Sequence, residues 1–291
     1  MFDGFTPAEF NHDGVVIPYV SAGQGAPVLL LHGFPQTHAM WAKIAPVLAK
    51  SYQVICPDLR GYGAASKPKN VTDYSFRAMG SDQLALMSSL GFDRFHLIGH
   101  DRGARTAHRM ALDAPERVQS LTVMDIIPTH LLLSELTQQV AKAYYHWFFM
   151  AQPEPLPETL ISSDPFAFYE SCLFGWGGAD GSGFATDQMA AYRTAWQDPE
   201  VVRGMCNDYR AALEIDFDLD EQDLGRILDM PACVLWGADG VMGRSYDVAR
   251  TWSNRLSNMT AKALPGGHFF PDQYPVETAQ ALQSFLDSCQ D

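Results

Sequence analysis

The fold of this chain is decided by one stretch, Leu97-Ile98-Gly99-His100-Asp101-Arg102-Gly103-Ala104-Arg105. An apolar run leads into it, and a helix-compatible run, 102–112, follows it. Gly99 and Gly103 stand two residues before and two residues after Asp101, which is the spacing of a nucleophile elbow. Such an elbow needs small neighbours because its central residue sits in a strained turn between a strand and a helix. The spacing therefore predicts a strand, a tight turn with Asp101 at its tip, and a helix.

An aspartate at the centre of an elbow favours a particular chemistry. A carboxylate can attack a saturated carbon, expel a leaving group and form an alkyl ester, which water must then cleave. The ordinary alternative is an aspartate that only caps the N-terminus of the helix. A cap does not explain the two flanking glycines, so the sequence predicts a hydrolase with Asp101 as its nucleophile.

Short apolar runs alternate with helical patterns along most of the chain. A helical stretch such as 78–90 separates several of these runs. This alternation predicts an α/β protein with a mostly parallel sheet and helices on both faces, which with the elbow is the α/β-hydrolase fold. The strands are expected at 15–20, 28–31, 54–56, 95–98, 121–124, 232–236 and 261–264.

The alternation breaks once, in a long segment without any apolar strand pattern. This segment is helical in pattern, rich in aromatic residues and interrupted by a proline-rich run, 153–157, and a glycine-rich run, 175–183. We expect it to be a helical cap, 129–225, over the carboxyl edge of the sheet. The α/β-hydrolase core is then expected in two parts, 1–128 and 226–291.

Composition excludes several classes of function. The net charge of −14 argues against nucleic acid or an anionic membrane surface as a partner. No apolar run approaches the ~20 residues of a membrane span, and residues 1–10 lack the pattern of a signal peptide, so we expect a cytoplasmic protein. The five cysteines are scattered without metal-binding spacing, so we expect reduced thiols and no metal.

A candidate base and two candidate acids follow the elbow in the chain. His268 stands just after the last expected strand, and the order nucleophile, acid, histidine is that of α/β-hydrolases. Asp125 and Asp239 each follow an expected strand. Many such enzymes place the acid at Gly-x-x-Asp, but Gly240 occupies that position after Gly237. We therefore favour Asp125, at a strand end beside the elbow, to hold the imidazole tautomer.

Charged and backbone donors surround the expected nucleophile. The backbone amides of Phe34, in the His-Gly-Phe-Pro loop, and of Arg102 can form an oxyanion hole for ester cleavage. The side chains of Arg102 and Arg105 can hold a substrate carboxylate through bidentate hydrogen bonds, which suggests a small carboxylic acid. The alternative is that both are surface arginines paired with helix acids. We expect His32 to be structural.

With these residues the chain resembles the fluoroacetate dehalogenases, the haloacetate dehalogenase branch of the α/β-hydrolase superfamily. The resemblance implies a triad of Asp101, Asp125 and His268, and substrate carboxylate binding by Arg102 and Arg105. It covers essentially the whole chain, and its specific motifs are HGFPQTH (32–38), GHDRGAR (99–105), DIxPT (125–129), YHW (145–147), DYRA (208–211) and GGHFF (266–270).

The same resemblance implies roles for residues of the cap. His146, Trp147 and Tyr209 fall where the family binds the halide, and their N–H and O–H groups are donors that can solvate a leaving fluoride. Trp176 matches a family tryptophan in a glycine-rich loop near the site. His130 stands where we expect an aromatic residue, which leaves its role open. The family also suggests a homodimer.

The sequence thus predicts a cofactor-free enzyme that hydrolyses 2-haloacetates to glycolate, halide and a proton. One alternative is an epoxide hydrolase, which shares the aspartate elbow and the His-Gly-Phe-Pro loop but typically uses two cap tyrosines. The His146-Trp147 pair and the two arginines speak against it. A second alternative is a non-catalytic binding protein of the same fold, against which the intact triad argues.

Overall fold

A computed structural model describes residues 1–175 and 181–289. In these residues, eight strands form one sheet in the order β1-β2-β4-β3-β5-β6-β7-β8. The pairs β1–β2 and β2–β4 are antiparallel, and every other pair is parallel. The expected fold class is confirmed. The strands are β1 (Thr6–His12), β2 (Val15–Ala22), β3 (Pro27–Leu31), β4 (Gln53–Pro57), β5 (Phe95–His100), β6 (Val118–Met124), β7 (Ala232–Gly237) and β8 (Met259–Leu264).

Strand β1 was not expected, whereas all seven predicted strands are present. It pairs with β2 through a tight hairpin whose turn residues, Asp13 and Gly14, both have positive φ (49° and 84°). Paired positive φ values are typical of a type I′ hairpin turn, for which Asp-Gly is a common sequence. β1 alternates between exposed and half-buried residues, so it carries no apolar run. The Asp-Gly pair was the signal that could have revealed it.

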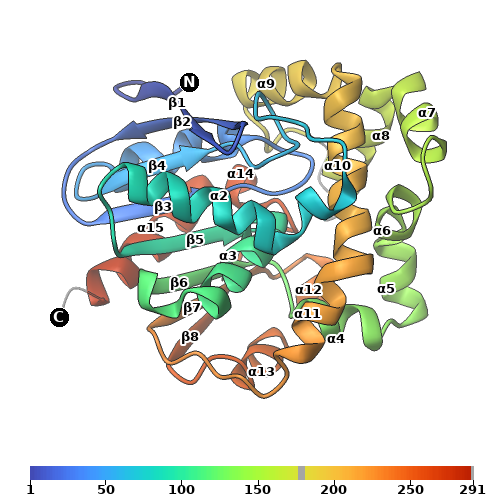
Figure 1. The fold of residues 1–291 in the computed structure, drawn as a ribbon. Helices are drawn as coiled ribbons and strands as arrows, with labels where there is room; N and C mark the ends of the chain where they lie inside the picture. Colours follow the sequence, from blue (N-terminus) through green and yellow to red (C-terminus); the bar gives the residue numbers. More distant parts are fainter. Residues whose placement is uncertain (176–180, 290–291) are drawn as a thin grey trace.

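Helices cover both faces of the sheet, as Figure 1 shows for α2 and α3 in front and α15 behind. The core of the protein lies between these layers, where β3 and β5 are almost entirely buried. The helices of this part are η1 (His38–Lys43), α1 (Ala45–Leu48), η2 (Val71–Tyr74), α2 (Phe76–Ser89), α3 (Arg102–Asp113), η3 (Pro115–Arg117), α12 (Val241–Ser245), α13 (Val248–Ser253), α14 (Phe270–Gln273) and α15 (Pro275–Ser288).

The segment between β6 and β7 is helical and gathers on one side of the sheet (Figure 1). The exact division into core and cap at residues 129 and 225 stays a prediction. The helices here are α4 (Thr129–Ser134), α5 (Gln138–Ala143), α6 (Tyr145–Met150), α7 (Leu156–Ser163), α8 (Pro165–Gly175), α9 (Thr186–Trp196), α10 (Pro199–Ala211), the π-helix η4 (Ala212–Asp216) and α11 (Phe217–Gln222).

One helix of the cap, α9, is hydrogen-bonded to the core of the protein. The indole N–H of Trp196 on α9 donates to the Pro35 carbonyl at 2.6 Å, which ties the cap to the loop after β3. His130 on α4 stacks on Phe217 of α11, with ring centroids 4.8 Å apart. Its position therefore has a packing role between two cap helices.

No helix in the described part of the chain is both long and apolar enough to cross a membrane.

Candidate active site

Asp101 occupies a strained turn between β5 and α3. Its φ of 49° is rare for a residue with a side chain, and the backbone there approaches other segments closely. A Cβ on Gly99 would lie 2.4 Å from the Gly103 carbonyl oxygen, and one on Gly103 would lie 2.3 Å from the His32 carbonyl oxygen. Only glycine fits at these two positions, which explains the spacing seen in the sequence.

The structure brings the three residues of the expected triad together. His268 Nδ1 lies 2.6 Å from Asp125 Oδ2, and His268 Nε2 lies 3.5 Å from Asp101 Oδ2. Asp125 also accepts a hydrogen bond from the Gly237 amide at 2.8 Å. The side chain of the rival acid, Asp239, is 62% exposed and lies 4.0 Å from Arg244. The geometry therefore favours Asp125 as the partner of the imidazole.

Asp101 and His268 shift each other's pKa. Burial raises the pKa of Asp101, but contact with His268 and the nearby cations outweigh it, so the net pKa lies well below the ordinary value. Burial also lowers the pKa of His268, but Asp101 and Asp125 outweigh it and raise the pKa to about 9. At neutral pH the resting site therefore holds an ionised Asp101 beside a protonated His268.

The two oxygens of Asp101 have different surroundings. The Phe34 amide donates to Asp101 Oδ1 at 2.9 Å, whereas Oδ2 faces His268. Arg102 is the first residue of α3, where backbone N–H groups have no partner within the helix. The Phe34 amide thus already binds Oδ1, and the Arg102 amide stays the second donor that the sequence predicts for an oxyanion hole. Oδ2 is left as the oxygen that can attack.

Arg102 is anchored to the cap by a buried ion pair. Its guanidinium binds both carboxylate oxygens of Asp208 on α10. Asp208 also accepts a hydrogen bond from the Tyr62 hydroxyl at 2.5 Å. Burial alone would lower the pKa of Arg102, but Asp208 raises it above its ordinary value. Among the described residues, Arg102 Nη1 has no hydrogen-bond partner. One donor of this arginine therefore remains available beside the nucleophile.

Arg105 is a buried cation without an anionic partner among the described residues. Its Nη1 donates only to neutral acceptors, the Ile127 carbonyl at 3.1 Å and the Thr129 hydroxyl at 3.0 Å. Its Nε has no partner in the part of the chain that is described. Burial, and then the charge of Arg102, lower the pKa of Arg105 to about 10, so it stays protonated at neutral pH. Such a cation favours an anionic ligand.

The three cap residues assigned to halide binding lie above the elbow. His146 stacks on Phe34 at 5.8 Å between ring centroids, and Tyr209 packs edge-on against Phe34 at 5.2 Å. The Trp147 ring lies 4.8 Å from the guanidinium carbon of each arginine. Within residues 1–175 and 181–289, neither the Trp147 N–H nor the Tyr209 hydroxyl has a hydrogen-bond partner. Trp176 lies outside the described residues.

Protonation states suit all three cap residues to donate hydrogen bonds. Burial raises the pKa of Tyr209 well above its ordinary value, so the phenol keeps its proton. Burial also lowers the pKa of His146 well below its ordinary value, so its ring is neutral and carries one N–H. The indole of Trp147 is always a donor.

Three supporting residues were missed in the sequence. His100 Nε2 lies 2.8 Å from the His268 carbonyl and fixes the loop that carries the imidazole. Asp208 and Tyr62 orient Arg102. Asp208 lies in the DYRA motif, beside the assigned Tyr209, and His100 directly precedes Asp101. For Asp208 and His100, a position next to an assigned residue was the only signal, and Tyr62 had none, because the partners of all three are more than 100 residues away in sequence.

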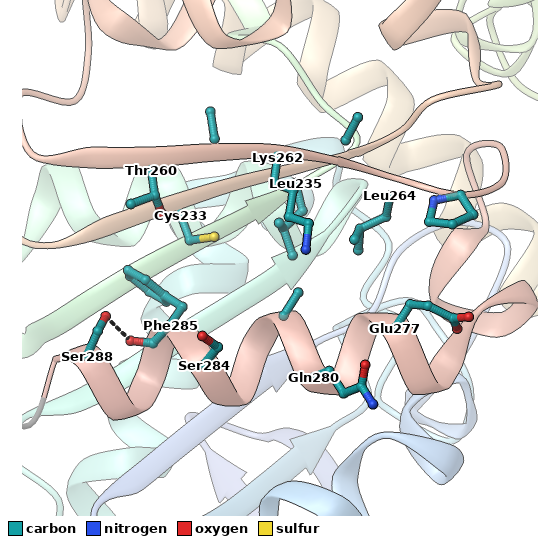
Figure 2. Close-up of a pocket in the computed structure, with 14 residues that line it drawn as sticks. Cys233, Leu235, Thr260, Lys262, Leu264, Glu277, Gln280, Ser284, Phe285 and Ser288 are labelled. Atoms are coloured by element: carbon teal, nitrogen blue, oxygen red, sulfur yellow. Dashed lines mark hydrogen bonds between the residues drawn. The ribbon is translucent and has the colours of Figure 1, made fainter.

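A surface groove of about 590 Å³ lies elsewhere, between β8 and α15. Figure 2 shows Glu277, Gln280 and Ser284 of α15 along one wall and Thr260 and Lys262 of β8 along the other. None of the triad residues lines it.

In the described part of the chain, no cluster of three or more histidine, cysteine or acidic residues could hold a metal ion.

Comparison with known proteins identifies the family of the chain. The family model described as the alpha/beta hydrolase fold matches residues 26–274. A fluoroacetate dehalogenase from Burkholderia sp. is 52% identical over 98% of this chain and 95% of its own, and a soluble epoxide hydrolase from Corynebacterium sp. (strain C12) is 31% identical over 92% and 93%.

A solved structure of a protein described as an α/β hydrolase, from Nostoc sp. PCC 7120, superposes with a TM-score of 0.96. It is 47% identical to this chain, and the match covers 98% of this chain and 99% of that one. Identity above 50% over nearly the whole length, together with the matching fold, confirms the resemblance seen in the sequence. The chain belongs to the fluoroacetate dehalogenase family of α/β-hydrolases.

Proposed function

We propose that this protein hydrolyses 2-haloacetates, including fluoroacetate and chloroacetate, to glycolate, halide and a proton. One observation carries the proposal: Arg105 is a buried cation with no described anionic partner, on the helix that begins directly after the elbow carboxylate, Asp101. A small substrate with a carboxylate and a leaving group on the next carbon would match both. The identity to a fluoroacetate dehalogenase supports the same substrate class.

In the first step, Asp101 Oδ2 attacks the carbon that carries the halogen. A carbon–oxygen bond forms, the carbon–halogen bond breaks, and the halide leaves with the bonding electrons. Arg105 and Arg102 Nη1 hold the substrate carboxylate, which aligns the carbon for in-line attack. The low pKa of Asp101 keeps the nucleophile ionised. The N–H and O–H donors of Trp147 and Tyr209, with His146, solvate the departing halide.

In the second step, water cleaves the ester. Alkylation removes the negative charge of Asp101, one of the two carboxylates that raise the pKa of His268. The pKa of His268 therefore falls, the imidazolium loses its proton to solvent, and Nε2 can act as a base. Water then attacks the ester carbon of Asp101, whose oxyanion accepts hydrogen bonds from the Phe34 and Arg102 amides. The water gives one proton to His268 Nε2, which restores the imidazolium. The bond between the ester carbon and Oδ2 breaks, glycolate departs with the original Oδ2 and takes the second proton of the water, and the Asp101 carboxylate is regenerated.

Two alternatives explain less of the site. An epoxide hydrolase that acts on neutral substrates would not use the buried charge of Arg105. The Corynebacterium soluble epoxide hydrolase is 31% identical to this chain, compared with 52% for the fluoroacetate dehalogenase. A binding protein without catalysis would not need the contacts of His268 with both Asp101 and Asp125.

The test is a substrate panel with an isotope measurement. Purified protein and Asp101→Ala are incubated with fluoroacetate, chloroacetate and styrene oxide, and halide, glycolate and diol are quantified. We expect halide and glycolate from the wild type only. In a single turnover in ¹⁸O-water with enzyme in excess, the new glycolate oxygen should be unlabelled. Fully labelled glycolate would mean direct attack by water and would overturn the covalent route.

The proposal extends to a homodimer in the cytoplasm. All five cysteines are unpaired, which suits a reducing compartment. Leu156 and Leu160 lie one turn apart on α7 and are 51% and 53% exposed, so they offer an apolar surface to a second copy. Light scattering should give the mass of a dimer for the wild type and of a monomer for Leu160→Lys. A monomeric wild type at micromolar concentration would contradict the dimer.

A further inference from the structure

We propose that the same site also hydrolyses epoxides that carry a carboxylate on a ring carbon. The simplest substrate is oxirane-2-carboxylate (glycidate), and the product is 2,3-dihydroxypropanoate (glycerate). This inference rests on the proposed function, because it uses the same nucleophile, arginines and base. It adds a second kind of atom that the nucleophile can displace, the ring oxygen of an epoxide. Unlike a halide, this oxygen stays attached to the product.

The Tyr209 hydroxyl is the group that makes ring opening feasible. It is fully buried, retains its proton and has no hydrogen-bond partner among the described residues. Its ring packs at 5.2 Å from that of Phe34, whose amide binds Asp101, and at 4.4 Å from the guanidinium carbon of Arg102. A phenol here can donate to an oxygen that develops charge opposite the nucleophile. A halide accepts a hydrogen bond but, unlike an alkoxide, does not need to take the proton.

The shape of glycidate matches that of a haloacetate at the reacting carbon. Its C2 carries both the carboxylate and the ring oxygen, just as C2 of a haloacetate carries both the carboxylate and the halogen. With the carboxylate held by Arg105 and Arg102 Nη1, the ring oxygen lies where the halogen would lie. Glycidate has one heavy atom more than a haloacetate, the ring CH₂. The buried charge of Arg105 favours this acid over neutral epoxides.

The atoms balance without any co-reactant except water. Asp101 Oδ2 forms a bond to C2, the C2–oxygen bond breaks, and its electron pair goes to the ring oxygen. That oxygen takes a proton from Tyr209, and the resulting phenolate is reprotonated from solvent. Water activated by His268 then cleaves the ester, as in dehalogenation. The sum is glycidate plus water giving glycerate, with inversion at C2 and no halide or net proton released.

The first experiment measures glycerate from each enantiomer of glycidate. Wild type and Asp101→Ala are compared, with glycidamide as the neutral substrate and chloroacetate as the positive control. We expect glycerate from one enantiomer at least about tenfold above Asp101→Ala, and little turnover of glycidamide. If chloroacetate is hydrolysed but neither enantiomer is, the epoxide proposal is overturned while the dehalogenase proposal stands. If neither substrate class reacts, the dehalogenase proposal itself fails.

A second experiment separates ring opening from unrelated hydrolysis. His268→Gln exposed to glycidate should accumulate an ester on Asp101 whose added mass equals the whole substrate, because no atom leaves; peptide mapping locates it. Tyr209→Phe should lower glycidate turnover about 100-fold and chloroacetate turnover less, since chloride needs no proton. Tyr145→Phe, a cap tyrosine that is 46% exposed, is the matched control and should retain both activities. Equal losses on both substrates in Tyr209→Phe would refute the role of Tyr209 as proton donor.

Discussion

The two halves of the candidate site differ in whether their polar groups have hydrogen-bond partners in the resting protein. In the core half, His268 contacts both Asp101 and Asp125, and a backbone amide binds each carboxylate. In the cap half, the donors of Trp147 and Tyr209 are buried without a hydrogen-bond partner among the described residues. The core half is complete before substrate arrives, whereas the cap half is complete only when an acceptor enters.

This difference has an energetic meaning. A buried donor without a partner costs about 1–3 kcal/mol, so native proteins rarely keep such groups unless function requires them. Here the unpartnered donors destabilise the resting state, and they gain a hydrogen-bond acceptor when charge develops on the leaving group. Hydrogen bonds that form in this transition state accelerate the reaction. The core half should therefore control whether reaction occurs, and the cap half which leaving groups depart.

Breaking the base of the core half should have the largest effect. His268→Gln should reduce steady-state turnover at least about 10³-fold, because the ester step loses its base. Alkylation needs only the carboxylate, so an adduct should accumulate. Intact-mass spectrometry after chloroacetate exposure, with peptide mapping, should find a carboxymethyl ester on Asp101. An unmodified variant would assign His268 a different role.

The choice of acid can be tested within the same half. Asp125→Asn should slow turnover about 10²- to 10³-fold, because it removes the partner of His268 Nδ1. It should also lower the pKa of His268 from about 9, so that in an NMR titration the imidazole loses its proton at a lower pH than in the wild type. Asp239→Asn, at an exposed aspartate, is the matched control and should leave turnover within about twofold. The reverse ranking would make Asp239 the acid.

The arginines stand between the two halves and should behave differently. Arg105→Leu should raise KM for chloroacetate about 10- to 100-fold but leave the reaction with chloroacetamide little changed, because its charge has no described protein partner. Arg102→Leu instead leaves the buried carboxylate of Asp208 without its cation, which should cost about 3–5 kcal/mol of stability. Kinetics on both substrates and thermal unfolding distinguish these outcomes. Equal loss on acid and amide in Arg105→Leu would refute carboxylate binding.

Local sequence patterns predicted the strands and the elbow well and the supports of the site poorly. The elbow glycines and the strands were visible because each is specified by neighbouring residues. β1 was missed because its residues are largely exposed and form no apolar run. The pairing of Arg102 with Asp208, and of His100 with the His268 carbonyl, joins residues 106 and 168 positions apart. Only the folded chain brings these partners together, so no spacing in the sequence predicts their contacts.

The smallest but most specific effect should come from the cap half. Trp147→Phe removes one N–H and keeps an aromatic ring between the two arginines. Fluoride is strongly hydrated and a poor leaving group, so its departure depends most on donors that replace water, and bromide needs little such help. We expect fluoroacetate turnover to fall about tenfold more than bromoacetate turnover, which corresponds to about 1.4 kcal/mol. Both rates are measured on one preparation, so an inactive fraction cancels from the ratio. Proportional loss on fluoroacetate, chloroacetate and bromoacetate would mean that Trp147 only packs the cap, and halide solvation would then rest on His146 and Tyr209.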